Sequence, residues 1–277
     1  MSTDFSRSSG AALDRALRLP LVSGARVDVL HVLPDRAPDA EEAEAAAQLE
    51  REIGRARSAA PGCSARLVAS CVRGIPYVEI IRAARARDAE LLVVGVHGTR
   101  EFRDLLIGST ASRVVRMGDF PVLLVRQPAL AAYRNALVAV ALTDADPRLL
   151  HLARWIGVER PSVVHAVHVP FQGFQAPTAA AREELRAEYC SDASAKLQSL
   201  VAAVDAGVQN TTVRAGDARA IVLEEARRLD SELLICGTHA RSGIAHALLG
   251  SVTETLIAQA PCDVLVARPT RFTFDLP

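Results

Sequence analysis

An internal repeat limits the folds open to this chain of 277 residues more than any other feature of its sequence. Short motifs of the first half return in the second half, most of them 142 residues later, and one returns after 137 residues. The matched positions are Gly74 and Gly216, Gly95 and Gly237, Gly108-Ser109 and Gly250-Ser251, Arg126 and Arg268, and, at the shorter spacing, Leu30-His31-Val32 and Val167-His168-Val169. A repeat of about 140 residues has the size of a domain rather than of a solenoid unit. The sequence therefore predicts two similar domains in tandem.

The boundary between the two copies is predicted in the stretch 127–132, where a proline follows one apolar run and precedes the next. This choice gives a first domain over residues 1–128 and a second over residues 133–277. Half of the residues are hydrophobic, so each copy can bury a core.

Within each copy, short apolar runs alternate with amphipathic helical patterns. Continuous apolar runs flanked by helices are typical of parallel strands that are buried on both faces. The fold class predicted is α/β, with two tandem, doubly wound parallel sheets. The expected strands are 26–32, 65–72, 91–95 and 122–126 in the first copy and 136–140, 162–169, 210–215, 233–237 and 264–268 in the second; the expected helices of the first copy are 9–21, 39–59, 76–87 and 107–117.

The first copy begins too late to contain its first strand. The strand at 136–140 precedes Ala141-Leu142-Thr143, but the matching stretch Thr3-Asp4-Phe5-Ser6 lies almost at the start of the sequence. A first strand of this fold is central, so its loss would leave backbone groups unpaired. We expect the native start to lie upstream; the alternative is that the alternating tail 271–276 supplies a replacement strand.

A glycine-rich loop carries the chemistry of the first copy. Gly95 and Gly98 follow a buried strand, and after nine residues Gly108-Ser109 opens a helix. Glycine allows close approach of backbone to a ligand, and a helix N-terminus offers free N–H groups and partial positive charge. This pattern favours a phosphate site over the alternative of a tight turn followed by a serine cap.

The same residues resemble the ATP-binding branch of the universal stress protein family. Its signature, Gly-x2-Gly-x9-Gly-Ser, is matched by Gly95, Gly98, Gly108 and Ser109, and Thr3-Asp4-Phe5-Ser6 is similar to the loop after the first strand of that family. The similarity covers nearly the whole chain, twice. It implies five-stranded sheets with strand order 3-2-1-4-5, a nucleotide across the carboxyl edge of the sheet, and dimer-like pairing of modules through their last strands.

The resemblance also implies roles for single residues. Asp4 would contact the ribose or the adenine edge, Val32 would flank the adenine, and Arg100 is a candidate phosphate partner. The full set of expected ligand-binding residues is Asp4, Val32, Val94, Gly95, Gly98, Arg100, Gly108, Ser109 and Thr110. ATP, with or without Mg²⁺, is the expected ligand, and no residue is assigned to catalysis or to a metal site.

The second copy departs from this pattern at two positions. Ala141 replaces the aspartate, and Ala240 replaces the second glycine of the loop. Alanine has no carboxylate for a ribose, and its methyl group narrows the loop. The second copy is therefore expected to be structural or to bind a nucleotide weakly.

Composition excludes several other classes of function. Thirty-two basic and thirty-two acidic residues cancel, which argues against broad attraction to nucleic acid or to anionic membranes. The five cysteines contain no C-x-x-C pair, and the sequence has no signal peptide and no long apolar run, so a cytoplasmic protein is expected. His97 and His239 have no Cys or carboxylate nearby at metal-ligand spacing, and His165 and His168 lie on opposite faces of the strand expected at 162–169, which makes them a poor metal pair.

The function predicted is that of a nucleotide-binding stress-response module without catalytic activity. One alternative is a slow ATPase or phosphotransferase, although the sequence contains no evident acidic pair for magnesium and no phosphate-binding lysine motif. Another is a dimerisation module without nucleotide. The two copies are expected to pair through the strands at 122–126 and 264–268, and a homodimer is a further expectation.

Overall fold

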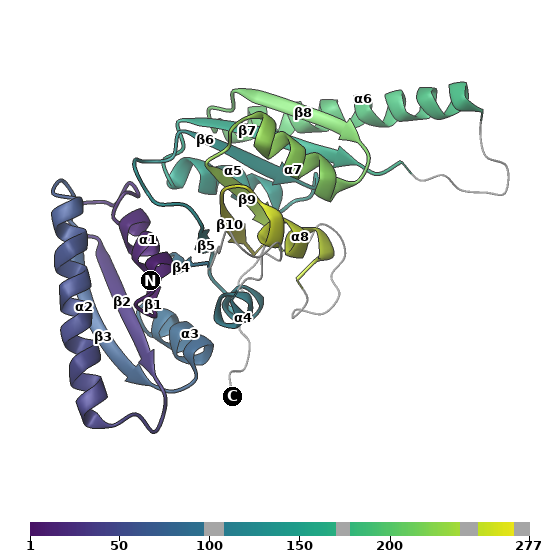
Figure 1. Ribbon diagram of the computed structural model, residues 1–277. Coiled ribbons are helices and arrows are strands. Elements are labelled where there is room, and N and C mark those ends of the chain that lie inside the picture. Colours follow the sequence, from purple (N-terminus) through teal and green to yellow (C-terminus); the bar gives the residue numbers. More distant parts are fainter. Residues whose placement is uncertain (97–107, 170–177, 239–248, 269–277) are drawn as a thin grey trace. The chain divides into compact units, whose positions relative to one another are not determined.

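The computed structural model describes residues 1–96, 108–169, 178–238 and 249–268 (Figure 1). The described chain divides into two compact units. Unit 1 contains residues 1–96, 108–132 and 262–268, and unit 2 contains residues 133–169, 178–238 and 249–261. The last strand of the second sequence repeat therefore belongs to unit 1.

Unit 1 is a sheet covered by helices, as the alternating pattern predicts. Its strands are β1 (Ser2–Thr3), β2 (Arg26–Leu33), β3 (Arg66–Arg73), β4 (Leu92–Gly95), β5 (Val122–Val125) and β10 (Asp263–Ala267), and its helices are α1 (Arg7–Ala16), α2 (Asp39–Ala59), α3 (Pro76–Ala86) and α4 (Ser109–Met117). Helix α1 contacts α2, and α3 contacts α4, which places the helices in two layers. The continuous apolar runs of β4 and β5 lie in the core between these layers, which is why they show no polar alternation.

Strands β1 to β5 lie in the predicted order, β3-β2-β1-β4-β5, and pair in parallel. The sheet of this unit has one strand more than the five parallel strands expected, because β10 is added beside β5. It pairs with β5 in the antiparallel direction, with Val264 opposite Leu124 and Val266 opposite Val122. An apolar strand at the edge of a sheet exposes unpaired backbone groups, and β10 satisfies those of β5.

The first strand of unit 1 is short but present, which corrects the expectation that it is missing. Ser2 pairs with Leu30 on one side and with Val94 on the other, so β1 holds the central position. The carbonyl of Met1 extends this pairing by accepting the N–H of Leu30 at 3.0 Å. Two residues are enough to place the following loop at the carboxyl edge of the sheet. The tail 271–276 lies outside the described residues.

Unit 2 repeats the arrangement with four strands in the order β9-β6-β7-β8. They are β6 (Asn135–Val140), β7 (Arg160–Val167), β8 (Asn210–Ala215) and β9 (Leu233–Gly237), and the helices are α5 (Asp146–Trp155), α6 (Ala179–Val204), α7 (Ala218–Arg228) and α8 (Ser251–Gln259). Strand β6 is central and pairs with β7 over six positions, where β1 pairs with β2 over two. These four strands keep the order predicted for the first four strands of the repeat, and the fifth, β10, is counted with unit 1.

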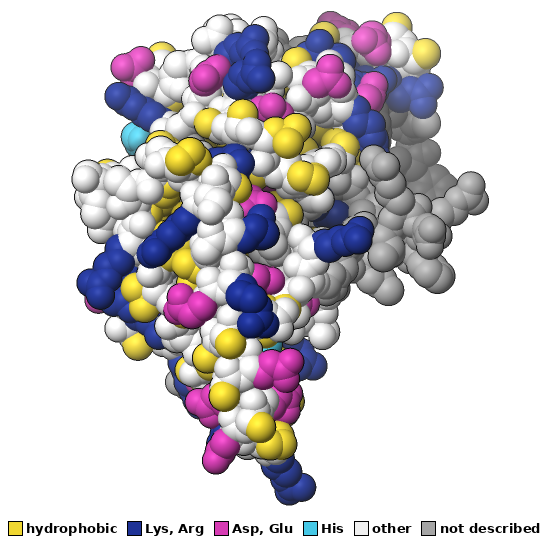
Figure 2. All heavy atoms as spheres, turned by 60° about the vertical axis from the view of Figure 1, so that its left-hand side comes forward, with side chains coloured by type: hydrophobic (Ala, Val, Ile, Leu, Met, Phe, Trp, Pro, Cys, Tyr) yellow, Lys and Arg dark blue, Asp and Glu magenta, His cyan; other side chains and the backbone are white. Residues whose placement is uncertain are grey.

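Basic and acidic side chains are interspersed on the face of the molecule that Figure 2 shows, with hydrophobic side chains scattered singly among them. This mixture agrees with the equal numbers of basic and acidic residues in the sequence.

Candidate functional site

The loop between β1 and α1 holds Asp4 at the carboxyl edge of the sheet. Phe5 takes a left-handed backbone conformation with φ of 63°, so the chain turns sharply there. Two side chains stabilise the turn: Thr3 Oγ1 accepts the N–H of Phe5 at 3.0 Å, and Asp4 Oδ1 accepts the N–H of Ser6 at 3.1 Å. Ser6 then caps α1 by accepting the N–H of Ser9 at 3.2 Å. Asp4 is thus held at an exposed position by a closely bonded loop.

An aromatic pair lies beside this loop, and the sequence analysis did not identify it. The rings of Phe5 and His31 stack with centroids 4.3 Å apart and an angle of 28° between their planes. His31 Nδ1 lies 2.9 Å from the carbonyl oxygen of Thr3, and because a carbonyl only accepts, Nδ1 carries the proton of this bond. Phe5 also packs against the cluster of Leu33, Ala37 and Ala45. The signal for this pair was in the sequence, since Phe5 is the aromatic residue within the quoted loop.

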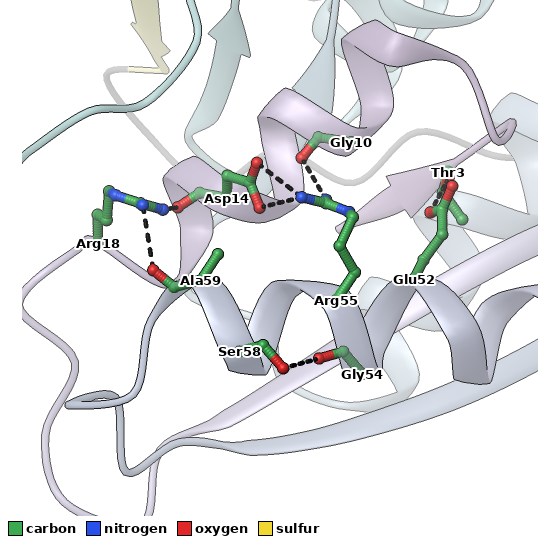
Figure 3. Close-up of polar contacts among 9 residues, drawn as sticks. All are labelled: Thr3, Gly10, Asp14, Arg18, Glu52, Gly54, Arg55, Ser58 and Ala59. Carbon is green, nitrogen blue, oxygen red and sulfur yellow. Dashed lines mark hydrogen bonds and ion pairs between the residues drawn. The ribbon is translucent and has the colours of Figure 1, made fainter.

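Helix α2 forms polar contacts with β1 and α1, the two elements that the loop connects (Figure 3). Glu52 Oε2 accepts a hydrogen bond from the hydroxyl of Thr3 at 3.3 Å, and Arg55 forms an ion pair with Asp14 of α1 at 3.1 Å. Arg18, which follows the end of α1, donates to the carbonyl of Ala59 at 3.3 Å. Burial raises the pKa of Glu52, and the hydrogen bond from Thr3 opposes that rise. These contacts fix α1 and α2 around the residue that precedes Asp4.

Two further predicted site residues lie at the ends of the strands on either side of β1: Val32 is the last residue but one of β2, and Gly95 is the last residue of β4. Because β1 lies between β2 and β4 in parallel, the ends of all three strands meet at one edge, so Asp4, Val32 and Gly95 are brought together. Val32 is half-buried, whereas Val94 is buried within β4 and belongs to the core.

Gly95 has a packing role that the sequence analysis did not predict. A Cβ atom at this position would lie 2.4 Å from the carbonyl carbon and oxygen of Ser8 and 2.7 Å from the nitrogen of Ser9. The end of β4 therefore runs directly against the backbone of α1, and only glycine fits there. This requirement holds whether or not a ligand is bound.

The start of α4 supplies the remaining described part of the motif. Gly108 is the N-cap residue, and no side chain caps this helix within the described structure. The first N–H groups of α4 have no partner within the helix, and they carry the positive end of its dipole. Ser109 is exposed at the first helical position, and Thr110 follows it, half-buried. Gly98 and Arg100 lie outside the described residues.

Unit 2 builds the same edge with different side chains. Leu142 has a φ of 58°, close to that of Phe5, and His165 Nδ1 lies 2.9 Å from the carbonyl of Val140, as His31 does from Thr3. His165 is thus the counterpart of His31. The predicted match of His31 with His168 is wrong by three residues, because β7 ends at Val167 and His168 follows the strand.

A buried carboxylate stabilises the loop of unit 2. Asp146, only 3% exposed, accepts the N–H groups of Ala141 at 3.3 Å and of Thr143 at 2.6 Å. Burial raises the pKa of Asp146, and these N–H bonds oppose that rise. Asp146 occupies the position that Ser9 has in unit 1. Its contacts with the loop therefore correspond to those of the Ser9 side chain, and they do not substitute for the carboxylate of Asp4, whose position is occupied by Ala141.

A cavity of about 570 Å³ opens at the carboxyl edge of unit 2. Residues of β6, β7 and β9, of the loop after β6, of α5, α6 and α7 and of the start of α8 line it. The sequence analysis expected this copy to be structural or weakly binding, and the cavity shows that space for a small molecule is present there. Ala240 lies outside the described residues.

Two kinds of feature are absent from the described residues. No group of three or more His, Cys, Asp or Glu side chains is arranged to hold a metal ion among them. None of the described helices is long and apolar enough to span a membrane.

The sequence profile of the universal stress protein family matches residues 2–126 and again residues 132–268. Universal stress protein A homolog 2 of Coxiella burnetii is 30% identical over 141 residues, which make up 49% of this chain and 95% of that protein. A universal stress protein of Methanocaldococcus jannaschii is 32% identical over 56 residues, or 20% of this chain and 35% of that protein.

A solved structure supports the fold over nearly the whole chain. The crystal structure of a universal stress protein from Archaeoglobus fulgidus aligns with a TM-score of 0.68 and 20% identity, covering 97% of each chain. With both repeats matched by one family and the sheet order confirmed in unit 1, the chain belongs to the universal stress protein family, of which it contains two modules in tandem.

Proposed function

We propose that the first module binds ATP at the carboxyl edge of its sheet and acts as a non-catalytic switch in a cytoplasmic stress response. The observation that carries this proposal is that Asp4, Val32 and Gly95 lie at one edge of the sheet, in the module that also contains the uncapped start of α4. Membership of the family and the complete glycine motif support it further.

The groups at this edge suit the parts of an adenine nucleotide. The carboxylate of Asp4 can accept hydrogen bonds from a ribose diol. Val32 offers a half-buried apolar side chain for a base. The uncapped N-terminus of α4 and the hydroxyl of Ser109 are donors for phosphate oxygens. If Mg²⁺ accompanies ATP, phosphates and water are expected to coordinate it.

Calorimetric titration with ATP tests the proposal, with an expected stoichiometry of one per chain. Asp4→Ala should weaken binding about 10- to 100-fold, because a hydrogen bond to a charged group contributes about 1.5–3 kcal/mol. The matched control is Asp144→Ala, which removes an exposed acidic residue from the equivalent loop of unit 2 and should leave the affinity unchanged. Two equal sites per chain, or an unchanged affinity in Asp4→Ala, would contradict the proposal.

Glycine variants must be chosen with the packing of α1 in mind. Gly95→Ala would disturb the contact with Ser8 and Ser9, so a loss of ATP binding in it would not report on the ligand. Gly98→Ala introduces the methyl group that the second copy already has at Ala240, and it should weaken binding. Two alternatives remain: release of phosphate by the purified protein would favour a slow ATPase, and absence of binding would favour a dimerisation module without nucleotide.

We further propose that domains 1–128 and 133–277 pair within the chain, with a homodimer as a further level of assembly. The antiparallel pairing of β5 with β10 supports this proposal, since β10 comes from the second repeat. A variant that disrupts β10 should then change the protease susceptibility of both domains, which limited proteolysis of the full chain can measure.

A further inference from the structure

The cavity of unit 2 has the size of a small-molecule site but no carboxylate at the position of Asp4. Its volume of about 570 Å³ lies within the range common for small-molecule sites. Many of the side chains around it are aliphatic and come from strands, from the loop after β6 and from helices; they include Val140, Leu142, Leu149, Val167, Val222 and Leu256. These walls suit an apolar molecular body.

The start of α8 gives one end of this cavity a positive character. Gly250 is its N-cap residue, without a side-chain cap within the described structure, so the first N–H groups of the helix have no partner inside it. The N–H of Gly250 donates to the carbonyl of Thr238 at 3.0 Å, and the hydroxyl of Thr253 donates to the carbonyl of Gly237 at 2.7 Å. These two bonds tie the helix start to the end of β9, so its donors are held in place before any ligand arrives.

Lys196 of α6 adds a full positive charge to the lining. Its long stem can lie along apolar surface while its ammonium reaches an anion. Asp192, one turn earlier on the same helix, also lines the cavity. Because its negative charge offsets part of the positive charge of Lys196, this wall suits a ligand with one negative charge better than a ligand with several.

The acidic groups of the loop do not replace Asp4. Ala141 stands at its position, and the two oxygens of Asp146 accept backbone N–H groups of the loop itself. A ribose diol would therefore meet an alanine methyl group where the first module has a carboxylate.

From this combination we infer that the cavity of unit 2 binds a small organic monoanion with an apolar body, such as a medium-chain carboxylate, with its charge at the start of α8 and near Lys196. The tandem chain then contains two sites of different chemistry. This site does not depend on the nucleotide site proposed for the first module, because every residue that lines it belongs to unit 2.

Calorimetric titration of the full chain with octanoate, octanol and AMP tests the inference. Octanoate should bind at one site per chain, and octanol, which has the same apolar length without the charge, should bind at least tenfold more weakly. AMP should not compete with octanoate. Binding of octanol as tight as that of octanoate, or displacement of octanoate by AMP, would overturn the assignment.

Variants locate the site. Lys196→Met keeps an apolar stem and should weaken octanoate binding several-fold without changing octanol binding. The matched control is Arg182→Met, which removes a basic residue from the same helix outside this cavity and should change neither. Ala193→Leu fills the cavity from α6 and should abolish both.

The ATP titration keeps the two proposals separate. Unchanged ATP binding in these variants, together with lost octanoate binding, supports a separate site in unit 2. Octanoate binding that is unaffected by both Lys196→Met and Ala193→Leu overturns the inference, whatever the result for ATP.

Discussion

Asp263 is the residue whose removal tests the position of β10 most directly. Its carboxylate is fully buried in unit 1. One oxygen accepts the backbone N–H groups of Arg126 at 2.8 Å and Gln127 at 3.1 Å, and the other lies 3.4 Å from Nε of Arg15 on α1. Arg15 also donates to the carbonyl of Ala131 at 2.7 Å. One side chain of the second repeat therefore joins β10 to the end of β5 and to α1.

The expected cost of Asp263→Ala follows from these contacts. The variant leaves the partly buried N–H groups of Arg126 and Gln127 without this acceptor and the buried guanidinium of Arg15 without its carboxylate. Removing one partner of a buried ion pair costs about 3–5 kcal/mol, a large part of the about 5–15 kcal/mol that stabilises a typical domain. Asp263→Asn can still accept from Arg126 and Gln127, so it should destabilise less.

Native-state hydrogen exchange measures this effect where it arises. Amide protection in β5 and β10 should fall about a hundred- to several-thousand-fold in Asp263→Ala, as a loss of 3–5 kcal/mol requires. Asp35→Ala removes an exposed acidic residue and serves as the control, with a change within about 0.5 kcal/mol. If Asp263→Ala preserves protection to the same extent as this control, the contacts of Asp263 do not hold β10 in place.

Three further predictions concern packing, thiol reactivity and pH. Gly95→Ala should lower the free energy of unfolding by about 1–3 kcal/mol, because its methyl group would overlap the backbone of α1; an unchanged denaturation midpoint would contradict this packing. Burial raises the pKa of the Cys236 and Cys262 thiols to about 12, so mass spectrometry after brief alkylation of the native protein should find both unmodified and both labelled after unfolding. The pKa of Glu52 is raised above its ordinary value of 4.5, so the folded protein holds this proton longer than the unfolded chain and loses stability as pH rises from 4.5 through the folded pKa. Glu52→Gln should remove this part of the pH dependence, and identical denaturation profiles between pH 4 and 7 would refute it.

Local patterns in the sequence were sufficient for most of the elements and for two tandem modules, although they missed β1 and extended α1, predicted at 9–21, five residues beyond its end at Ala16. The helix predicted at 39–59 has the bounds of α2, and the apolar runs at 91–95 and 122–126 became β4 and β5 within a residue at an end. Such patterns succeed because a buried parallel strand and an amphipathic helix each impose a periodicity on consecutive residues. The gathering of Asp4, Val32 and Gly95 at one edge followed as well, since parallel strands place their carboxyl ends together.

Tertiary structure alone decided which distant groups meet. The attachment of β10 to unit 1, the stacking of Phe5 on His31 and the contact of Gly95 with Ser8 join residues that no local periodicity relates. The alignment of His31 with His168 failed for the same reason, because only strand register shows that His165 is its counterpart. The cavity of unit 2 depends on the space left between side chains of three strands and four helices, a quantity set by packing in three dimensions rather than by the order of residues along the chain.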